Sequence, residues 1–422
     1  MRTVLMTLGL ALSVAASAAA CGSQGEREPF GEDSPDGAVG SSGTSGTGSS
    51  GETINSGDSG TPITSEPGKT TLRGVTYAPN GTLPLAGVLV YETDVVPAPI
   101  PEHVYCDSCR VLPEGTFTVS GPDGSFELKG HAGARYLVTE KGQFRRVRRI
   151  EVGPDGTEQT VDATTTTLPG RTAAGSNGEG DTIPRIALMD ELSGDKDAIH
   201  LVLRALGIQE WENFQSDRSK VTAENLQNFH IALFPCDDRA QNAPKSAQIQ
   251  AVRGFVQAGG KAYASDWSHA YVDEAFKEFF KYPNRVWGAD VGAQSPTGRF
   301  DDDGLKAWLS AVSPGEDPNA TQLHGVWSTY TGMKDATVPD ATGANHTVSP
   351  YKFASITDNS GLYSSREAAT SMEFGCGRAL LSTFHVHGGT GNLLMQEKAL
   401  LYMLLDVSTC IGEPGRGGPV VN

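Results

Sequence analysis

The chain has 422 residues, a formal net charge of −17 and only 7% aromatic residues. An acidic chain without a basic stripe is a poor partner for nucleic acid, because lysine and arginine contacts to phosphate supply most of that affinity. The length exceeds what a single ordinary hydrophobic core uses, so we expect more than one domain.

Residues 1–20 have the features of a secretory signal peptide. The single positive charge of Arg2 precedes an apolar run over residues 4–16, and three alanines at 18–20 lead to Cys21. The apolar run is too short to span a bilayer and polar chain follows it, which favours a cleaved export signal over a membrane helix.

Cys21, directly after small residues, resembles the lipidated cysteine of a bacterial lipobox. The resemblance implies an acylated (palmitate-type) N-terminus, with the protein held at the cell membrane or outer membrane and facing the periplasm or the cell surface. The family has leucine three residues before the cysteine, where this chain has Ala18. Ordinary cleavage after Ala20 is the alternative, and it would leave Cys21 as a terminal thiol.

Residues 21–68 consist of Cys21 and a Gly/Ser/Thr-rich, acidic segment that we expect to be a disordered tether. Such a composition buries too little apolar surface to offset the entropy of ordering. As a flexible coil the tether would span roughly 40 Å, which is enough to hold a folded body clear of a lipid surface.

Residues 69–163 are predicted to form an all-β domain. Short alternating segments predict strands at residues 71–77, 87–91, 115–119, 125–128, 134–139 and 144–152. The turn signal Pro122-Asp123-Gly124 predicts a hairpin between the third and fourth of these strands. Several short strands at close spacing favour a β-sandwich.

The turn and core residues of this region resemble a known module of secreted bacterial proteins. They are G-V-T at 74–76, P-L-A-G-V-x-V at 84–90 and T-V-S-G-P-D-G-S-F-x-L at 118–128. The pattern is similar to the carboxypeptidase-regulatory-like (transthyretin-like) module over about residues 70–162. The resemblance implies a fold and no catalytic role.

A polar linker is expected at 164–182, followed by an α/β domain at 183–410 and a flexible tail at 411–422. Apolar periodicity predicts strands at 185–189, 229–234, 261–265, 351–356 and 378–386, and helices at 195–206, 246–258, 272–281, 305–312 and 394–407. The remainder of 284–345 is expected to be irregular. Strands that alternate with amphipathic helices predict a doubly wound, mainly parallel sheet with helices on both faces.

Three segments of this domain resemble the class I glutamine amidotransferase-like fold. They are residues 229–234, V-R-G-F-V-Q-A-G-G-K-A-Y-A-S-D-W at 252–267, and G-C-G-R-A-L-L-S-T-F-H-V-H at 375–387. The branch that resembles trehalose-utilisation-type proteins is the most similar, and the match covers about residues 183–408. The resemblance implies a flavodoxin/amidotransferase-like architecture.

The reacting groups of an amidotransferase are replaced in this chain. The family has a cysteine at the turn after the third strand, where this chain has Ser265-Asp266-Trp267, and a His-x-Glu pair where it has His385-Val386-His387. Because a thiolate attacks the amide and a carboxylate-oriented histidine moves the proton, glutaminase activity is not expected.

Cys236 and Asp237 end the second strand of the α/β domain, where an open parallel sheet forms its ligand crevice, so both are candidate ligand-binding residues. Two acidic neighbours, Asp237 and Asp238, disfavour the thiolate, so a structural cysteine is preferred to a nucleophile.

A second group of candidates follows the third and last strands: Asp266, Trp267, His269, His385 and His387. Imidazole and carboxylate groups are plausible metal ligands, or they could line a small-molecule pocket beside Trp267. The preferred interpretation is that the histidines are hydrogen-bonded residues at strand ends, and that no metal or other cofactor is required.

Exported chains favour disulfides. We expect Cys106 to pair with Cys109, although a zinc site with nearby His103 and His131 is an alternative, and Cys376 to pair with Cys410. Cys236 should then remain a thiol. The basic run at 145–149 is interpreted as an edge strand protected by charge, with anionic lipid or polysaccharide binding as the alternative.

Together these features predict a surface-anchored, non-catalytic lipoprotein whose degenerate amidotransferase-like domain binds a small polar or carbohydrate-like ligand or a protein partner. One alternative is a hydrolase with a His/Asp or metal-assisted site. The other is a structural envelope protein.

Overall fold

The computed structural model describes residues 66–107, 112–172, 180–190, 197–215, 217–236, 244–281, 294–329, 332–358, 367–388 and 393–405. The predicted signal peptide, Cys21, nearly all of the tether, Cys109, Asp237, Cys410 and the tail at 411–422 lie outside these ranges. The described residues all belong to one compact unit. Within the described ranges, none of the helices combines the length and apolar character needed to cross a bilayer.

The N-terminal region forms two small sheets. Its strands are β1 (Thr70–Val75), β2 (Leu89–Thr93), β3 (Phe117–Val119), β4 (Ser125–Gly130), β5 (Gly133–Lys141), β6 (Phe144–Val152) and β7 (Glu158–Thr160). One sheet has the order β4-β1-β7 and the other β3-β2-β5-β6. Alternate residues of β4 are buried, and one apolar cluster contains residues of both sheets, among them Leu72, Leu128, Val90 and Leu137. The two sheets therefore share a core.

The predicted hairpin across Pro122-Asp123-Gly124 is wrong. β3 pairs with β2, whereas β4 pairs with β1. The turn itself is present, because Gly124 has φ +76° and the Asp123 carboxylate accepts the backbone N–H of Ser125 at 3.0 Å. The turn signal was thus correct locally, but it carries the chain from one sheet to the other.

The basic run lies in β6, which is an edge strand as predicted. Its arginines are largely internal rather than exposed. Arg145 is buried and donates to Ala98 O at 2.5 Å, while Arg146 and Arg148 both donate to the buried Asp181 carboxylate. Arg145 also bridges to Thr182 through the backbone, so a chain segment covers this edge. Only Arg149 is exposed.

The C-terminal region is built on a mixed nine-stranded sheet with the order β13-β12-β16-β17-β18-β11-β10-β8-β9. Its strands are β8 (Ile186–Leu188), β9 (Glu212–Asn213), β10 (Ile231–Phe234), β11 (Lys261–Ser265), β12 (Thr297–Phe300), β13 (Thr321–Gln322), β16 (Tyr351–Ile356), β17 (Glu367–Phe374) and β18 (Gly377–Ser382). The strands from β9 to β18 pair in parallel. The strands from β18 to β13 pair antiparallel, so the sheet is not mainly parallel as predicted.

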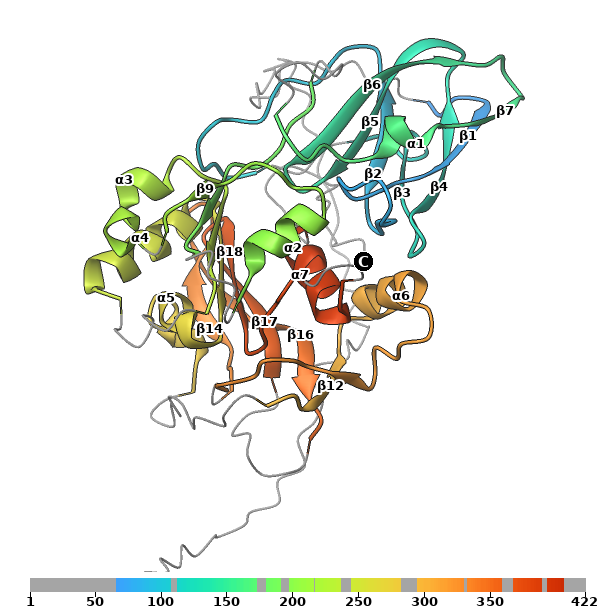
Figure 1. The fold of residues 1–422 in the computed structure, drawn as a ribbon. Coiled ribbons are helices and arrows are strands. Elements are labelled where there is room, and N and C mark those ends of the chain that lie inside the picture. Colours follow the sequence, from blue (N-terminus) through green and yellow to red (C-terminus); the bar gives the residue numbers. More distant parts are fainter. Residues whose placement is uncertain are drawn as a thin grey trace, which may run out of the picture. The chain divides into compact units, whose positions relative to one another are not determined.

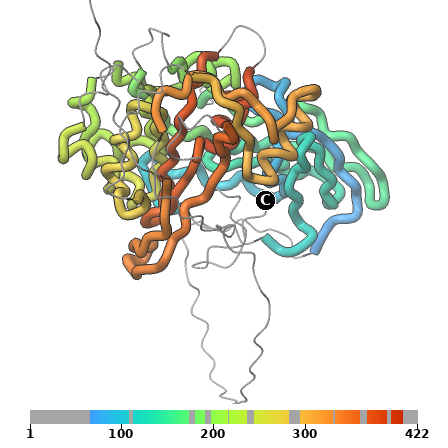
Figure 2. The backbone as a smooth tube through the Cα atoms, turned by 90° about the horizontal axis from the view of Figure 1, so that it is seen from below, coloured from blue at the N-terminus to red at the C-terminus, as the bar shows by residue number. Residues whose placement is uncertain are grey.

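Helices cover both faces of this sheet (Figure 1). They are α2 (Ile199–Ala205), α3 (Ala223–Leu226), α4 (Ser246–Gln257), α5 (Ala270–Asp273), α6 (Asp303–Val312) and α7 (Met395–Leu405); the short α1 (Ala163–Thr166) precedes the sheet. Successive strand residues face opposite sides. In β10, Ile231 and Leu233 join the cluster of α2, α6 and α7, while Ala232 and Phe234 join that of α4 and α5. Figure 2 also shows α3 and α4, in yellow-green, on one side of the orange-to-red strands.

Two predicted elements differ from the structure. The helix expected at 272–281 is replaced by α5, which ends at Asp273, and a 3₁₀ turn at Lys277–Phe279. The segment at 284–345 contains β12, β13 and a separate hairpin of β14 (Ala336–Pro339) and β15 (Asn345–Val348), in addition to α6. β17 was missed because its small and polar residues, such as Thr370 and Ser371, give no apolar alternation although most of them are buried.

The N-terminal sheets and the α/β region share packing. Leu85, Val88 and Phe144 belong to the same apolar cluster as α2, α6 and α7. The fully buried Trp308 of α6 donates its indole N–H to Pro84 O at 2.8 Å. The described part of the predicted linker takes part in this packing, since Leu168 is fully buried in the cluster.

A disulfide joins Cys106 to Cys376, with Cα atoms 5.4 Å apart, so both predicted pairings are wrong. Both cysteines meet at the C-terminal end of α4. The Cys376 N–H donates to Gln257 O, and Gly259 is so close to Tyr105 O that a Cβ there would lie 1.9 Å away. The pairing was predicted within each region separately, and the sequence does not reveal that the 101–107 loop reaches α4. Cys236 is not part of this disulfide, as expected.

We predict that proteolysis of the non-reduced protein releases one linked peptide that contains Cys106 and Cys376. Cys376→Ser should lower the free energy of unfolding by about 2–5 kcal/mol, because the bond closes a loop of 270 residues in the unfolded chain. Urea denaturation should show the same loss of unfolding free energy for Cys106→Ser. The double variant should lose no more than either single variant. A peptide that joins Cys106 to Cys109 would contradict the observed pairing.

Candidate functional site

The ends of three neighbouring strands bring the candidate side chains together. β10 is followed by Pro235 and Cys236, β11 by the 3₁₀ turn Asp266–His269, and β18 by residues 383–387. β11 lies between the other two and is parallel to both, with Ala264 opposite Phe234 and Ser265 opposite Ser382. The three carboxyl ends therefore lie at one edge of the sheet, where open α/β sheets bind their ligands.

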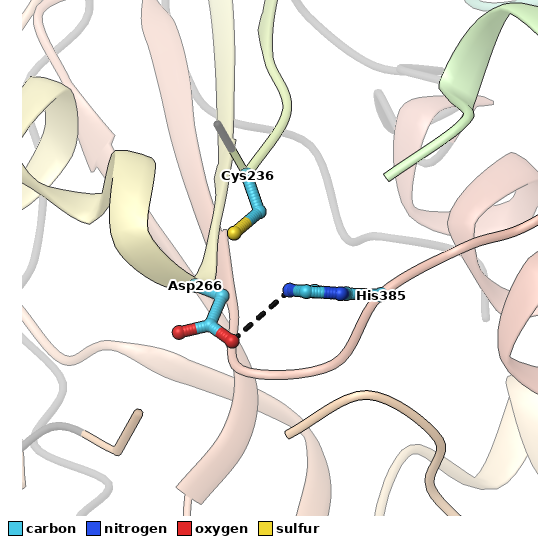
Figure 3. A group of neighbouring side chains, drawn as sticks. All are labelled: Cys236, Asp266 and His385. Atoms are coloured by element: carbon cyan, nitrogen blue, oxygen red, sulfur yellow. Dashed lines mark ion pairs between the residues drawn. The ribbon is translucent and has the colours of Figure 1, made fainter. Parts of the chain in front are cut away.

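Cys236, Asp266 and His385 meet at this edge (Figure 3). The thiol sulfur, one carboxylate oxygen and one ring nitrogen all lie within 4.8 Å of one another. Asp266 Oδ2 is 3.1 Å from His385 Nε2. The three residues are 5%, 1% and 1% exposed, so the cluster is enclosed by protein.

Asp266 occupies a strained turn. Its φ is +40°, in a region that favours glycine, and such a conformation in another residue costs of order 1–3 kcal/mol. Here the carboxylate accepts the backbone N–H of Trp327 at 2.9 Å and the hydroxyl of Ser328. These two hydrogen bonds hold residues 327–328 against the end of β11.

A buried carboxylate, Asp197, connects all three strand ends. It accepts the backbone N–H of Cys236 at 3.2 Å, the hydroxyl of Ser265 and the backbone N–H of Val386 at 2.7 Å. Each donor is a member of the cluster or its neighbour in the chain. Burial raises the pKa of the Asp197 carboxyl, whereas His385 and the three donors favour the charged form.

The sequence did not reveal the role of Asp197. The residue falls inside the helix predicted at 195–206, whereas α2 begins only at Ile199. An acidic residue two positions before a helix carries no signal that distinguishes it from an ordinary residue of the first turn.

His385 is held from two further elements. The backbone of Gly325 packs on its ring, since a Cβ there would lie 2.7 Å from His385 Cβ, and Gly325 has φ +69°. The Gln396 side chain of α7 accepts the His324 N–H at 2.8 Å and donates to His385 O. The 324–328 segment thus holds the ring of His385, and α7 holds its backbone.

The other predicted residues do not join the cluster. His269 pairs through Nδ1 with Asp273 Oδ2 at 2.6 Å. His387 is exposed, with its ring 6.1 Å from that of His385. Trp267 is partly exposed and meets Trp327 edge to face, with ring centroids 5.5 Å apart. Asp237 lies outside the described residues.

A second buried pair lies at the same edge of the sheet and was also missed. Asp190, two residues after β8, accepts from His200 of α2, with Oδ2 2.7 Å from the ring Nδ1. Both residues are buried. The pair ties the end of β8 to α2, and a lone histidine on an apolar helix face gave no indication of its partner.

Comparison with known proteins finds only distant similarity, and only to solved structures. No protein-family model matches the chain, and no curated protein matches it at a significant level. Among solved structures, a ThuA-like protein from Bacteroides uniformis is 10% identical with a TM-score of 0.31, and covers 56% of this chain and 94% of its own. A cytoplasmic protein from Salmonella typhimurium is 9% identical with a TM-score of 0.32, and covers 53% and 98%.

A β-galactosidase from Rahnella is also similar, at 14% identity and a TM-score of 0.29 over 53% of this chain. The match spans 31% of the length of that enzyme. Likenesses with TM-scores this low carry no argument about activity, substrate or family.

Proposed function

We propose that this chain is an exported lipoprotein, anchored through Cys21, whose α/β domain has an amidotransferase-like architecture without glutaminase activity. In this proposal the domain at 183–410 binds a small polar or carbohydrate-like ligand, or a protein at the cell surface. The β-sandwich at 69–163 and the tether at 21–68 space it from the membrane.

Two observations support the architecture. The parallel strands have the spatial order β9-β8-β10-β11-β18, which in chain order is 2-1-3-4-5. This is the order of flavodoxin-like doubly wound sheets. The two N-terminal sheets share one apolar cluster, as the two halves of a sandwich do.

The observation that carries the non-catalytic proposal is the residue at the strained turn after β11. Asp266 stands there, and its buried carboxylate is occupied by Trp327 N–H and the Ser328 hydroxyl. A carboxylate in this arrangement offers no thiolate to attack an amide. The nearby Cys236 is 5% exposed and lies at the end of β10 rather than at this turn, enclosed with Asp266 and His385.

The ligand is proposed to contact the aromatic pair outside the cluster. Trp267 and Trp327 are both partly exposed, and their rings meet edge to face. Trp267 follows the buried Asp266 in the chain, and the Trp327 N–H donates to the Asp266 carboxylate. Aromatic faces beside polar groups suit a sugar ring, which has apolar and hydroxyl-bearing faces.

We expect no release of ammonia from glutamine by the purified protein, because no activated nucleophile is present at the turn. A coupled glutamate dehydrogenase assay measures this release, and Cys236→Ala should give the same baseline. Turnover by the wild type that disappears in Cys236→Ala would contradict the non-catalytic proposal.

Ligand binding should depend on Trp267. In a fluorescence titration with a panel of neutral oligosaccharides, Trp267→Ala should weaken the binding of any oligosaccharide that binds the wild type by about tenfold or more, because aromatic anchors dominate such contacts. Trp211→Ala is the matched control, since Trp211 is also partly exposed but packs near Arg204. An equal loss of affinity in both variants would show that Trp267 is not a specific part of the binding surface.

If Cys21 is acylated, the mature protein should partition into the detergent phase on Triton X-114 separation. Cys21→Ser should transfer it to the aqueous phase or leave the precursor uncleaved, since the acyl chains supply the affinity for lipid. Mass spectrometry that finds an unacylated Cys21 at the mature N-terminus would rule out the lipid anchor.

A further inference from the structure

The cluster of Cys236, Asp266 and His385 contains three different metal-ligand groups. A thiol, a carboxylate and an imidazole come from three separate strand ends, and their ligand atoms all lie within 4.8 Å of one another. All three side chains are buried and point toward one another (Figure 3). The sequence offered Asp266, His269, His385 and His387 only as an alternative metal site, and Cys236 as a ligand-binding candidate. The cluster joins Cys236 to Asp266 and His385 without His269 and His387.

The spacing is close to that of a transition-metal site. Zinc binds cysteine sulfur at about 2.3 Å and histidine nitrogen or carboxylate oxygen at about 2.0–2.2 Å. With these bond lengths, two ligand atoms at a tetrahedral angle are roughly 3.3–3.6 Å apart. Asp266 Oδ2 and His385 Nε2 are 3.1 Å apart, so a small displacement of the side chains would admit an ion between them.

We infer that Cys236 Sγ, the Asp266 carboxylate and His385 Nε2 bind one divalent transition-metal ion of the zinc type. Three protein ligands leave a fourth position for water or an exogenous ligand. The thiolate and the carboxylate balance the two positive charges of the ion, which a buried cation requires. Thiolate and imidazole ligands favour zinc over magnesium or calcium, which prefer oxygen.

The surroundings orient the ligands in the manner of an outer coordination shell. Asp197 accepts the backbone N–H of Cys236. It also accepts the N–H of Val386, next to His385, and the hydroxyl of Ser265, next to Asp266. Trp327 N–H and the Ser328 hydroxyl fix the Asp266 carboxylate, and Gly325 fixes the His385 ring. Partners of this kind commonly change metal affinity by 10–100-fold when they are mutated.

The inference goes beyond the proposed function and does not rest on it, because a protein with or without catalytic activity or a sugar ligand can hold this ion. The competing explanation is a hydrogen-bonded cluster that holds the strand ends together without metal. The two differ in stoichiometric metal content and in the role of the Cys236 sulfur.

The test uses the full-length purified protein, stripped with a chelator and titrated with Co²⁺ and then Zn²⁺. We expect one equivalent of Co²⁺ with a sulfur-to-cobalt charge-transfer band, and displacement of Co²⁺ by Zn²⁺. Cys236→Ser and His385→Gln should lose the band and at least about 100-fold in affinity. His346→Gln, which changes an exposed histidine of β15, should bind as the wild type does.

Measurements on one further variant and on the wild type remain informative if those variants do not fold. Asp197→Asn leaves the three ligands in place and should weaken binding by roughly 10–100-fold. On the wild type alone, Zn²⁺ addition should release protons and raise the melting temperature, and zinc X-ray absorption should show one sulfur ligand. Failure to bind a stoichiometric ion, or a bound ion without a sulfur ligand, would overturn the inference.

Discussion

The arrangement of this sheet edge depends on one buried carboxylate. Asp197 accepts hydrogen bonds at the ends of β10, β11 and β18, so one residue just before α2 sets the relative positions of three strand ends. A buried carboxylate is costly unless donors surround it, and here each donor is supplied by a different segment. The cost of burying the charge is therefore offset only when all three segments are in place. This makes the local structure cooperative.

The change of strand direction within the sheet separates two roles. The parallel half carries the cluster and is covered by helices on both faces, as parallel sheets require. The antiparallel half, from β17 to β13, extends the sheet away from the cluster. Its last strand, β13, leads in the chain to the 324–328 segment, which covers Asp266 and His385. The extension thus supplies the cover of the cluster from residues that are distant in the sequence.

Much of the fold was accessible from local pattern. The strand at Tyr351–Ile356 and the helix at Ser246–Gln257 follow their apolar periodicity almost residue for residue. β17 was not accessible, because its Thr370 and Ser371 are polar and are buried only through the neighbouring strands β16 and β18. The mixed strand direction escaped prediction for the same reason, since strand order and direction depend on contacts between segments.

The candidate site was half predicted. Asp266 and His385 follow from the rule that strand ends meet at one edge, and the structure places them 3.1 Å apart. Cys236 was a ligand-binding candidate but was not among the possible metal ligands, and its acidic neighbours in the sequence argued against a nucleophile. Its side chain lies with Asp266 and His385. His269 was included on proximity in the sequence, but Asp273, one helical turn further on, holds its ring. Local spacing identifies a neighbourhood but not the direction of each side chain.

The disulfide between Cys106 and Cys376 also determines how the protein would bear mechanical load. Suppose that tension acts between the N-terminal end and the C-terminal helix α7. The covalent path then runs from Cys106 through the two sulfurs to Cys376, so the chain between them, which contains β8, β10 and β11, is shielded from stretching. Only the segments before Cys106 and after Cys376 can extend. Reduction of a single bond would convert this short, stiff connection into a long one that can unravel.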